Sequence, residues 1–161
     1  MYLNALEFLD EEREAWRPFE ALADLPDARL DQPIAEAHDW SARDLMGHLL
    51  AWQEVALAVA RELAVNETSQ AKAAADSDWE SRGGDVVNAE IQARYRSLTL
   101  DELRRRFRAV PGELRGTLTV VPETRWLKHP DHLRFFMDET VDHYADHEAD
   151  LGVILAASSG P

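Results

Sequence analysis

The chain has 161 residues, 45% of them hydrophobic, with no cysteine and a formal net charge of −14 from 17 basic and 31 acidic residues. This length suits one domain, 1–161, that buries a core without disulfides. The acidic balance argues against nucleic acid and membrane surfaces as partners, and the lack of cysteine excludes thiolate ligands and a cysteine nucleophile. No signal peptide or membrane-spanning run is found, so we expect a soluble, cytoplasmic protein.

The first half of the chain predicts two long helices separated by a proline-containing break. Apolar residues recur at helical spacing up to about residue 24. Ser41 and Asp44 resemble a capping box that opens the second helix, and a long apolar stripe follows them. Residues 65–84 are small and polar and predict a long loop, with a short helix over about 85–97 behind it.

The second half predicts two further long helices. Thr99 and Glu102 form a capping box for a helix that should reach about residue 121. Its apolar residues keep one phase across Pro111, so we expect a single kinked helix. The last helix is expected over about 131–156. Together these elements predict an all-α, antiparallel four-helix bundle with a long connection and a short extra helix between helices 2 and 3.

Three histidines interrupt the apolar stripes of the second and the last predicted helix. His143 and His147 lie one helical turn apart on the same face, and His48 lies on the inward stripe of the second helix. Neutral imidazoles buried without partners are costly, and a shared metal ion would satisfy all three. The alternative is three hydrogen-bonded core histidines without a metal. Spacing alone leaves both interpretations open, because such a histidine pair also arises by chance.

The residues around these histidines resemble the DinB-like superfamily. The run from Trp40 to Trp52 is similar to the opening of that family's second helix, and Asn88 and the pair His143 and His147 follow in the family's order. The resemblance implies a four-helix bundle, a homodimer in many members, with a divalent metal ion, commonly zinc or nickel. Its ligands here would be His48, His143 and His147.

The chemistry of known members implies an activity for this site. They include thiol-dependent enzymes, such as the mycothiol-dependent maleylpyruvate isomerase, and bacillithiol transferases. The sequence ends at Pro161, before the further C-terminal domain of the isomerase, so we expect a transferase or a hydrolase-like member instead. The resemblance implies activation of a low-molecular-weight thiol cosubstrate, or of water, for attack on a small electrophilic substrate. The alternative is a non-catalytic protein that binds metal or a small molecule in stress protection.

Further side chains are candidates for supporting the site, although none is assigned a catalytic role. Asp44, one turn before His48, could accept the second ring N–H of that histidine. Equally, it could be an acid that interacts with the dipole at the helix N-terminus. Arg82 could hold a substrate carboxylate, or it could be an exposed loop residue. The pocket candidates are Trp52, Trp79, Arg82 and Asn88.

Overall fold

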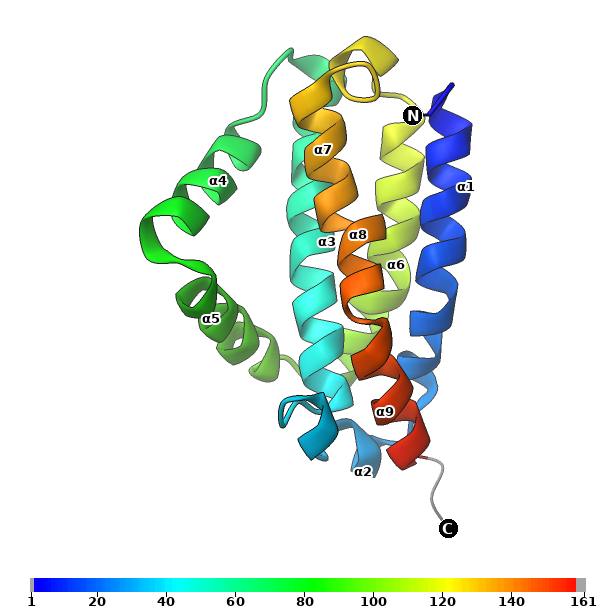
Figure 1. The fold of residues 1–161 in the computed structure, drawn as a ribbon, viewed down its shortest axis with the longest axis vertical. Helices are drawn as coiled ribbons and strands as arrows, with labels where there is room; N and C mark the ends of the chain where they lie inside the picture. Colours follow the sequence, from blue (N-terminus) through cyan, green and yellow to red (C-terminus); the bar gives the residue numbers. More distant parts are fainter. Residues whose placement is uncertain (1, 159–161) are drawn as a thin grey trace.

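The computed structural model describes residues 2–158, and every regular element in that part of the chain is a helix (Figure 1). In chain order the elements are α1 (Ala5–Trp16), the 3₁₀ helix η1 (Arg17–Asp24), α2 (Asp27–Leu30), η2 (Ala35–Ala37), α3 (Ala42–Val65), α4 (Gln70–Arg82), α5 (Gly84–Arg96), α6 (Leu100–Leu118), η3 (Glu123–Arg125), α7 (Pro130–Glu139), α8 (Val141–Asp146) and α9 (Glu148–Ser158). The predicted all-α class is therefore confirmed. No helix among these is both long and apolar enough to cross a membrane.

The long helices α1, α3 and α6 and the consecutive segments α7–α9 lie side by side (Figure 1). Two ion pairs show that α3 and α6 run in the same direction. Glu54 pairs with Arg106 and Arg61 pairs with Glu113, so the partner on α6 lies 52 positions further along the chain in both pairs. Helix α1 and the segments α7–α9 run the opposite way (Figure 1). The expected antiparallel arrangement therefore does not hold for α3 and α6. The helices α4 and α5 lead the chain back to the end of the molecule where α3 begins, and α6 starts at that same end (Figure 1).

Side-chain caps begin the two longest helices where the sequence predicts them. The Ser41 hydroxyl accepts the backbone N–H of Asp44 at 3.2 Å, and the Asp44 carboxylate accepts the backbone N–H of Ser41 at 3.0 Å. Thr99 likewise accepts the backbone N–H of Glu102 at 3.2 Å. Helix α6 then continues through Pro111 as one element, as its unbroken apolar phase indicates.

The prediction of a long loop over residues 65–84 is wrong, because most of this segment forms the helix α4. Ser69 caps this helix by accepting the backbone N–H of Lys72 at 3.0 Å. The helix is rich in alanine, the strongest helix former, but none of its residues is buried. It therefore has no apolar stripe, and helical periodicity could not reveal it.

The single helix predicted over about 131–156 is also wrong, since two breaks divide it into α7, α8 and α9. Thr140 (φ −130°, ψ −97°) separates α7 from α8, and His147 (φ −103°, ψ 5°) separates α8 from α9. The Thr140 hydroxyl donates to the Phe136 carbonyl at 2.5 Å. A threonine that bonds back to the carbonyl four residues earlier commonly bends a helix.

An aromatic cluster between α1, α6 and α8 fixes the inner face of α8. The ring centroid of the buried Trp16 lies 4.8 Å from that of Phe107 and 5.2 Å from that of Tyr144. Successive residues of a helix project about 100° apart. Since Tyr144 is held in the core, its neighbour His143 projects to another side of α8, toward α3.

Candidate metal centre

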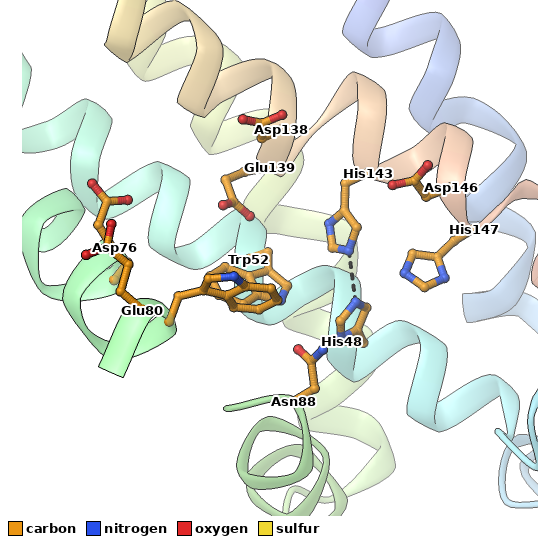
Figure 2. Close-up of a pocket in the computed structure, with 12 residues that line it drawn as sticks. His48, Trp52, Asp76, Glu80, Asn88, Asp138, Glu139, His143, Asp146 and His147 are labelled. Carbon is orange, nitrogen blue, oxygen red and sulfur yellow. Dashed lines mark hydrogen bonds between the residues drawn. The ribbon is translucent and has the colours of Figure 1, made fainter. Parts of the chain in front are cut away.

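Three imidazoles from α3 and from the α8–α9 region converge on one point (Figure 2). His48 and His143 place their Nε2 atoms 2.8 Å apart. Together with His147, they offer one nitrogen each within 4.8 Å of the other two. The structure thus brings together the three histidines that the sequence predicts as ligands, and the cluster could hold one metal ion.

Neighbouring groups set which ring nitrogen faces the centre. The Nδ1 atom of His147 lies 2.9 Å from the Asp150 carboxylate, which accepts its proton and leaves Nε2 as the nitrogen with a free lone pair. The Nδ1 atom of His143 is buried without a hydrogen bond of standard geometry, although the nearby Glu139 backbone carbonyl favours a proton there. The Trp40 ring stacks on the His147 ring at 5.7 Å and 22°. The contacts of Nδ1 in His143 and His147 favour an inward lone pair on the Nε2 atoms of these two rings, and the Nε2 of His48 lies within hydrogen-bond distance of that of His143.

Burial keeps the two most enclosed rings neutral. Burial, followed by the nearby His143 and His147 rings, lowers the pKa of His48 to about 2. Burial and the neighbouring His147 likewise lower the pKa of His143 to about 3, against the opposing effect of the Glu139 carbonyl. At pH 7 both side chains are therefore neutral, which is the protonation state that metal binding requires.

The three histidines line a cavity of about 510 Å³, a volume typical of small-molecule sites. Three of the predicted pocket residues lie there. Trp52 is buried and Trp79 is 45% exposed, and their rings meet edge to face with centroids 5.6 Å apart. Asn88 contributes a side-chain Oδ1 that is buried without a hydrogen-bond partner. The cavity thus joins the histidine cluster to an aromatic wall and a free acceptor.

The other two candidates, Asp44 and Arg82, have partners outside the site. The buried carboxylate of Asp44 accepts from Arg96 at 2.7 and 2.9 Å and from Ser41, rather than from His48. Although burial raises the pKa of Asp44, these hydrogen bonds outweigh that effect and lower it. Asp44 completes the predicted capping box and lies in the first turn of α3, where the alternative expects an acid that interacts with the helix dipole.

The side chain of Arg82 pairs with Asp78 on its own helix at 3.0 Å and with Glu90 on α5. It does not line the cavity that holds the three histidines. The physical reason is the helix α4, which the sequence did not reveal. Residues 78 and 82 share one face of that helix, so the nearest carboxylate takes up the guanidinium.

Sequence reasoning missed the acidic character of the cavity and the partner of His147. Burial raises the pKa of Glu139 to about 8, with smaller contributions from Asp138 and Asp76 and an opposing one from Lys72. A signal was present, since Glu139 lies one turn before His143 and Asp150 lies three residues after His147. The acidic lining residues are Asp76, Glu80, Asp138, Glu139 and Asp146.

The fold and the cluster define an all-helical protein with a candidate three-histidine metal centre. The sequence matches the family model of the DinB superfamily over residues 5–150. The chain therefore belongs to the DinB superfamily, which confirms the resemblance of its motifs. Comparisons with curated proteins and with solved structures found no match.

Proposed function

We propose that the protein binds one divalent metal ion, zinc or nickel, through His48, His143 and His147. The observation that carries this proposal is the convergence of three imidazole nitrogens within 4.8 Å at a site where burial keeps two of the rings neutral. Without a cation, the Nε2 of His48 can donate to the Nε2 of His143 at 2.8 Å, but no hydrogen bond among the described residues reaches the Nε2 of His147. The Nδ1 of His147 directs its proton outward to Asp150, so a cation suits the cluster better.

The activity that this site supports best is attack on a small electrophile by a low-molecular-weight thiol, of the mycothiol or bacillithiol type, or by water. A bound divalent ion would supply Lewis acidity, which lowers the pKa of a thiol or of water at neutral pH. The chain has no cysteine, so the thiol comes from a cosubstrate. Asp150 and Trp40 orient His147, while Trp52 and Trp79 wall the cavity in which the reactants meet.

We also propose that α1, α3, α6 and the segment α7–α9 form the four-helix bundle expected of the family, and that the protein is a homodimer. The side-by-side arrangement of these segments supports the bundle (Figure 1). Size-exclusion chromatography with light scattering tests the dimer. A mass of twice 18.2 kDa is expected, and a mass of one chain would overturn this part of the proposal.

Elemental analysis of purified protein, reconstituted separately with zinc and with nickel, tests the metal site. We expect one ion per chain for the wild type and none for a triple alanine variant of His48, His143 and His147. His129→Ala, which removes a histidine outside the cluster, serves as the matched control and should keep the ion. A wild type that retains neither metal would overturn the proposal.

Activity is then measured with mycothiol, bacillithiol and glutathione against an activated aryl halide, and with an activated ester for water. His143→Ala should abolish turnover while circular dichroism shows an intact helical fold. Tight metal binding without turnover in any of these reactions would favour the non-catalytic alternative, a protein that holds metal or a small molecule in stress protection.

A further inference from the structure

The charge of the cavity limits the substrates that it can accept. Its lining includes five carboxylates, and neither lysine nor arginine contributes to it. Two of the acids are paired with cations outside the lining, Asp76 with Lys72 at 2.6 Å and Asp138 with Arg134. The remaining three have no ion pair within residues 2–158, so no basic side chain is available in the cavity to neutralise them when they are ionised. These three are Glu80, Glu139 and Asp146.

Glu139 is the most enclosed of these free acids. Its side chain is partly buried, makes no hydrogen bond with any residue that the structure describes, and is directed toward Trp52 (Figure 2). It does not belong to the group of side chains close enough to share a metal ion, which comprises the three histidines. Because burial raises its pKa to about 8, this side chain is mainly protonated at pH 7 before a ligand binds, and a ligand that brings a positive charge favours its ionised form.

A side-chain amide in the same cavity also favours a ligand that donates hydrogen bonds. The buried Oδ1 of Asn88 is a hydrogen-bond acceptor without a donor. The indole rings of Trp52 and Trp79 border the same space, and aromatic faces attract cations. Acceptors and aromatic faces, without any basic side chain, match a group that donates N–H bonds and is positively charged.

We infer that the substrate of this site is a small cationic molecule whose ammonium or guanidinium group lies against Glu139, beside Trp52 and Trp79, while its reactive end reaches the three histidines. This inference rests on the proposed function and names its substrate class. No basic side chain lines the end of the cavity beside Glu139 to pair with a carboxylate, because Arg82 is held by Asp78 and Glu90.

Three thiols of similar size and different charge test the inference on zinc-loaded protein at pH 7. Cysteamine carries an ammonium group, 2-mercaptoethanol is neutral, and 3-mercaptopropionate carries a carboxylate. Dissociation constants are measured by quenching of tryptophan fluorescence. Cysteamine should bind about tenfold more tightly than 2-mercaptoethanol, and 3-mercaptopropionate more weakly than both.

Two matched variants assign this preference to one carboxylate. Glu139→Gln should bring the ratio of cysteamine to 2-mercaptoethanol affinity close to one. Glu113→Gln makes the same substitution on the exposed surface of α6, outside the cavity, and should keep the wild-type ratio. A role of Glu139 in accepting a proton from the thiol would instead weaken all three thiols alike, and that result would overturn the inference.

The outcome separates this inference from the metal proposal. If zinc binds and the three thiols have equal affinities, the substrate class is wrong while the metal centre stands. If zinc does not bind, the metal proposal fails, and the charge preference is measured on metal-free protein with butylammonium and butyrate. A preference for butylammonium that disappears in Glu139→Gln would then support the cationic subsite, and equal binding would overturn it.

Discussion

Helix α8 carries two adjacent residues, Tyr144 and His143, in opposite kinds of buried polar environment. The Tyr144 hydroxyl donates to Glu12 at 2.9 Å and accepts from Gln53 at 2.9 Å. Glu12 in turn accepts from Arg115 at 2.7 Å. On the other side of α8, the buried Nδ1 of His143 has no hydrogen bond of standard geometry, and its Nε2 faces another imidazole nitrogen.

The difference separates the part of the molecule that holds the fold together from the part that remains available to a ligand. The Tyr144 network links α1, α3, α6 and α8, and apart from Oε1 of Gln53 its side-chain polar atoms are satisfied within the protein. The histidine cluster is preorganised but incomplete. Since buried polar groups of native proteins are rarely left unpaired, the free Nδ1 of His143 supports the proposal that the cluster binds a metal ion.

The largest expected effect comes from breaking the Tyr144 network, in which Tyr144, Glu12, Gln53 and Arg115 hydrogen-bond one another. Arg115→Met leaves the fully buried Glu12 without its cation and should lower the free energy of unfolding by about 3–5 kcal/mol. Urea denaturation measures the change. Arg61→Met, which removes the exposed partner of Glu113 between α3 and α6, should cost less than about 1 kcal/mol. Equal losses in the two variants would contradict a structural role for the network.

The second prediction concerns the effect of adding zinc to the cluster of His48, His143 and His147. Zinc at one hundred times its dissociation constant should raise the free energy of unfolding of the wild type by about 2.7 kcal/mol. His143→Ala should abolish this increase. Arg115→Met should keep it, although its stability without zinc is lower. Thermal denaturation with and without zinc gives the comparison, and an increase that survives in His143→Ala would place the ion elsewhere.

The third prediction concerns pH and the metal-free protein. The pKa values of His48 and His143 are about 2 and 3 in the fold, against about 6.5 in an unfolded chain. Below pH 6.5 the unfolded chain therefore binds protons that the folded rings reject, and stability falls as the pH falls. Glu139 acts in the opposite direction, because its pKa of about 8 makes the folded state bind the extra proton.

These three groups together should lower the free energy of unfolding by about 2 kcal/mol between pH 6.5 and pH 4.5. Urea denaturation at each pH measures it. A His48→Phe/His143→Phe double variant should lose the histidine contribution and become more stable, not less, over that range through Glu139. A double variant with the same pH dependence as the wild type would show that the two rings are not buried and neutral.

The comparison also shows what the sequence can and cannot predict. His48, His143 and His147 were predictable because helical phase is a local property, and each histidine interrupts an apolar stripe. The bond of Asp44 to Arg96 was not, because it joins the start of α3 to the end of α5, 52 positions apart, and the path of the chain between them includes the unpredicted helix α4. Local patterns therefore predicted the three histidines that converge, while the surroundings of these histidines depended on tertiary contacts.

The smallest effect is expected from Asp150, the one acidic residue that hydrogen-bonds a histidine of the cluster among the residues that the structure describes. Asp150→Asn removes the charge that orients His147 and should weaken zinc binding about tenfold, measured by competition with a chelator of known affinity. Stability without metal should change by less than about 1 kcal/mol, because the asparagine oxygen can still accept the His147 N–H.

Asp146→Asn is the matched control for Asp150→Asn. It removes an equal charge next to His147, but no hydrogen bond joins Asp146 to the ring, so zinc affinity should stay within about twofold of the wild type. A similar loss in both variants would mean that charge alone sets the affinity. A loss of zinc affinity confined to Asp150→Asn would show that the hydrogen bond orienting His147 sets the affinity. The histidine cluster, like the Tyr144 network, would then depend on fixed hydrogen bonds.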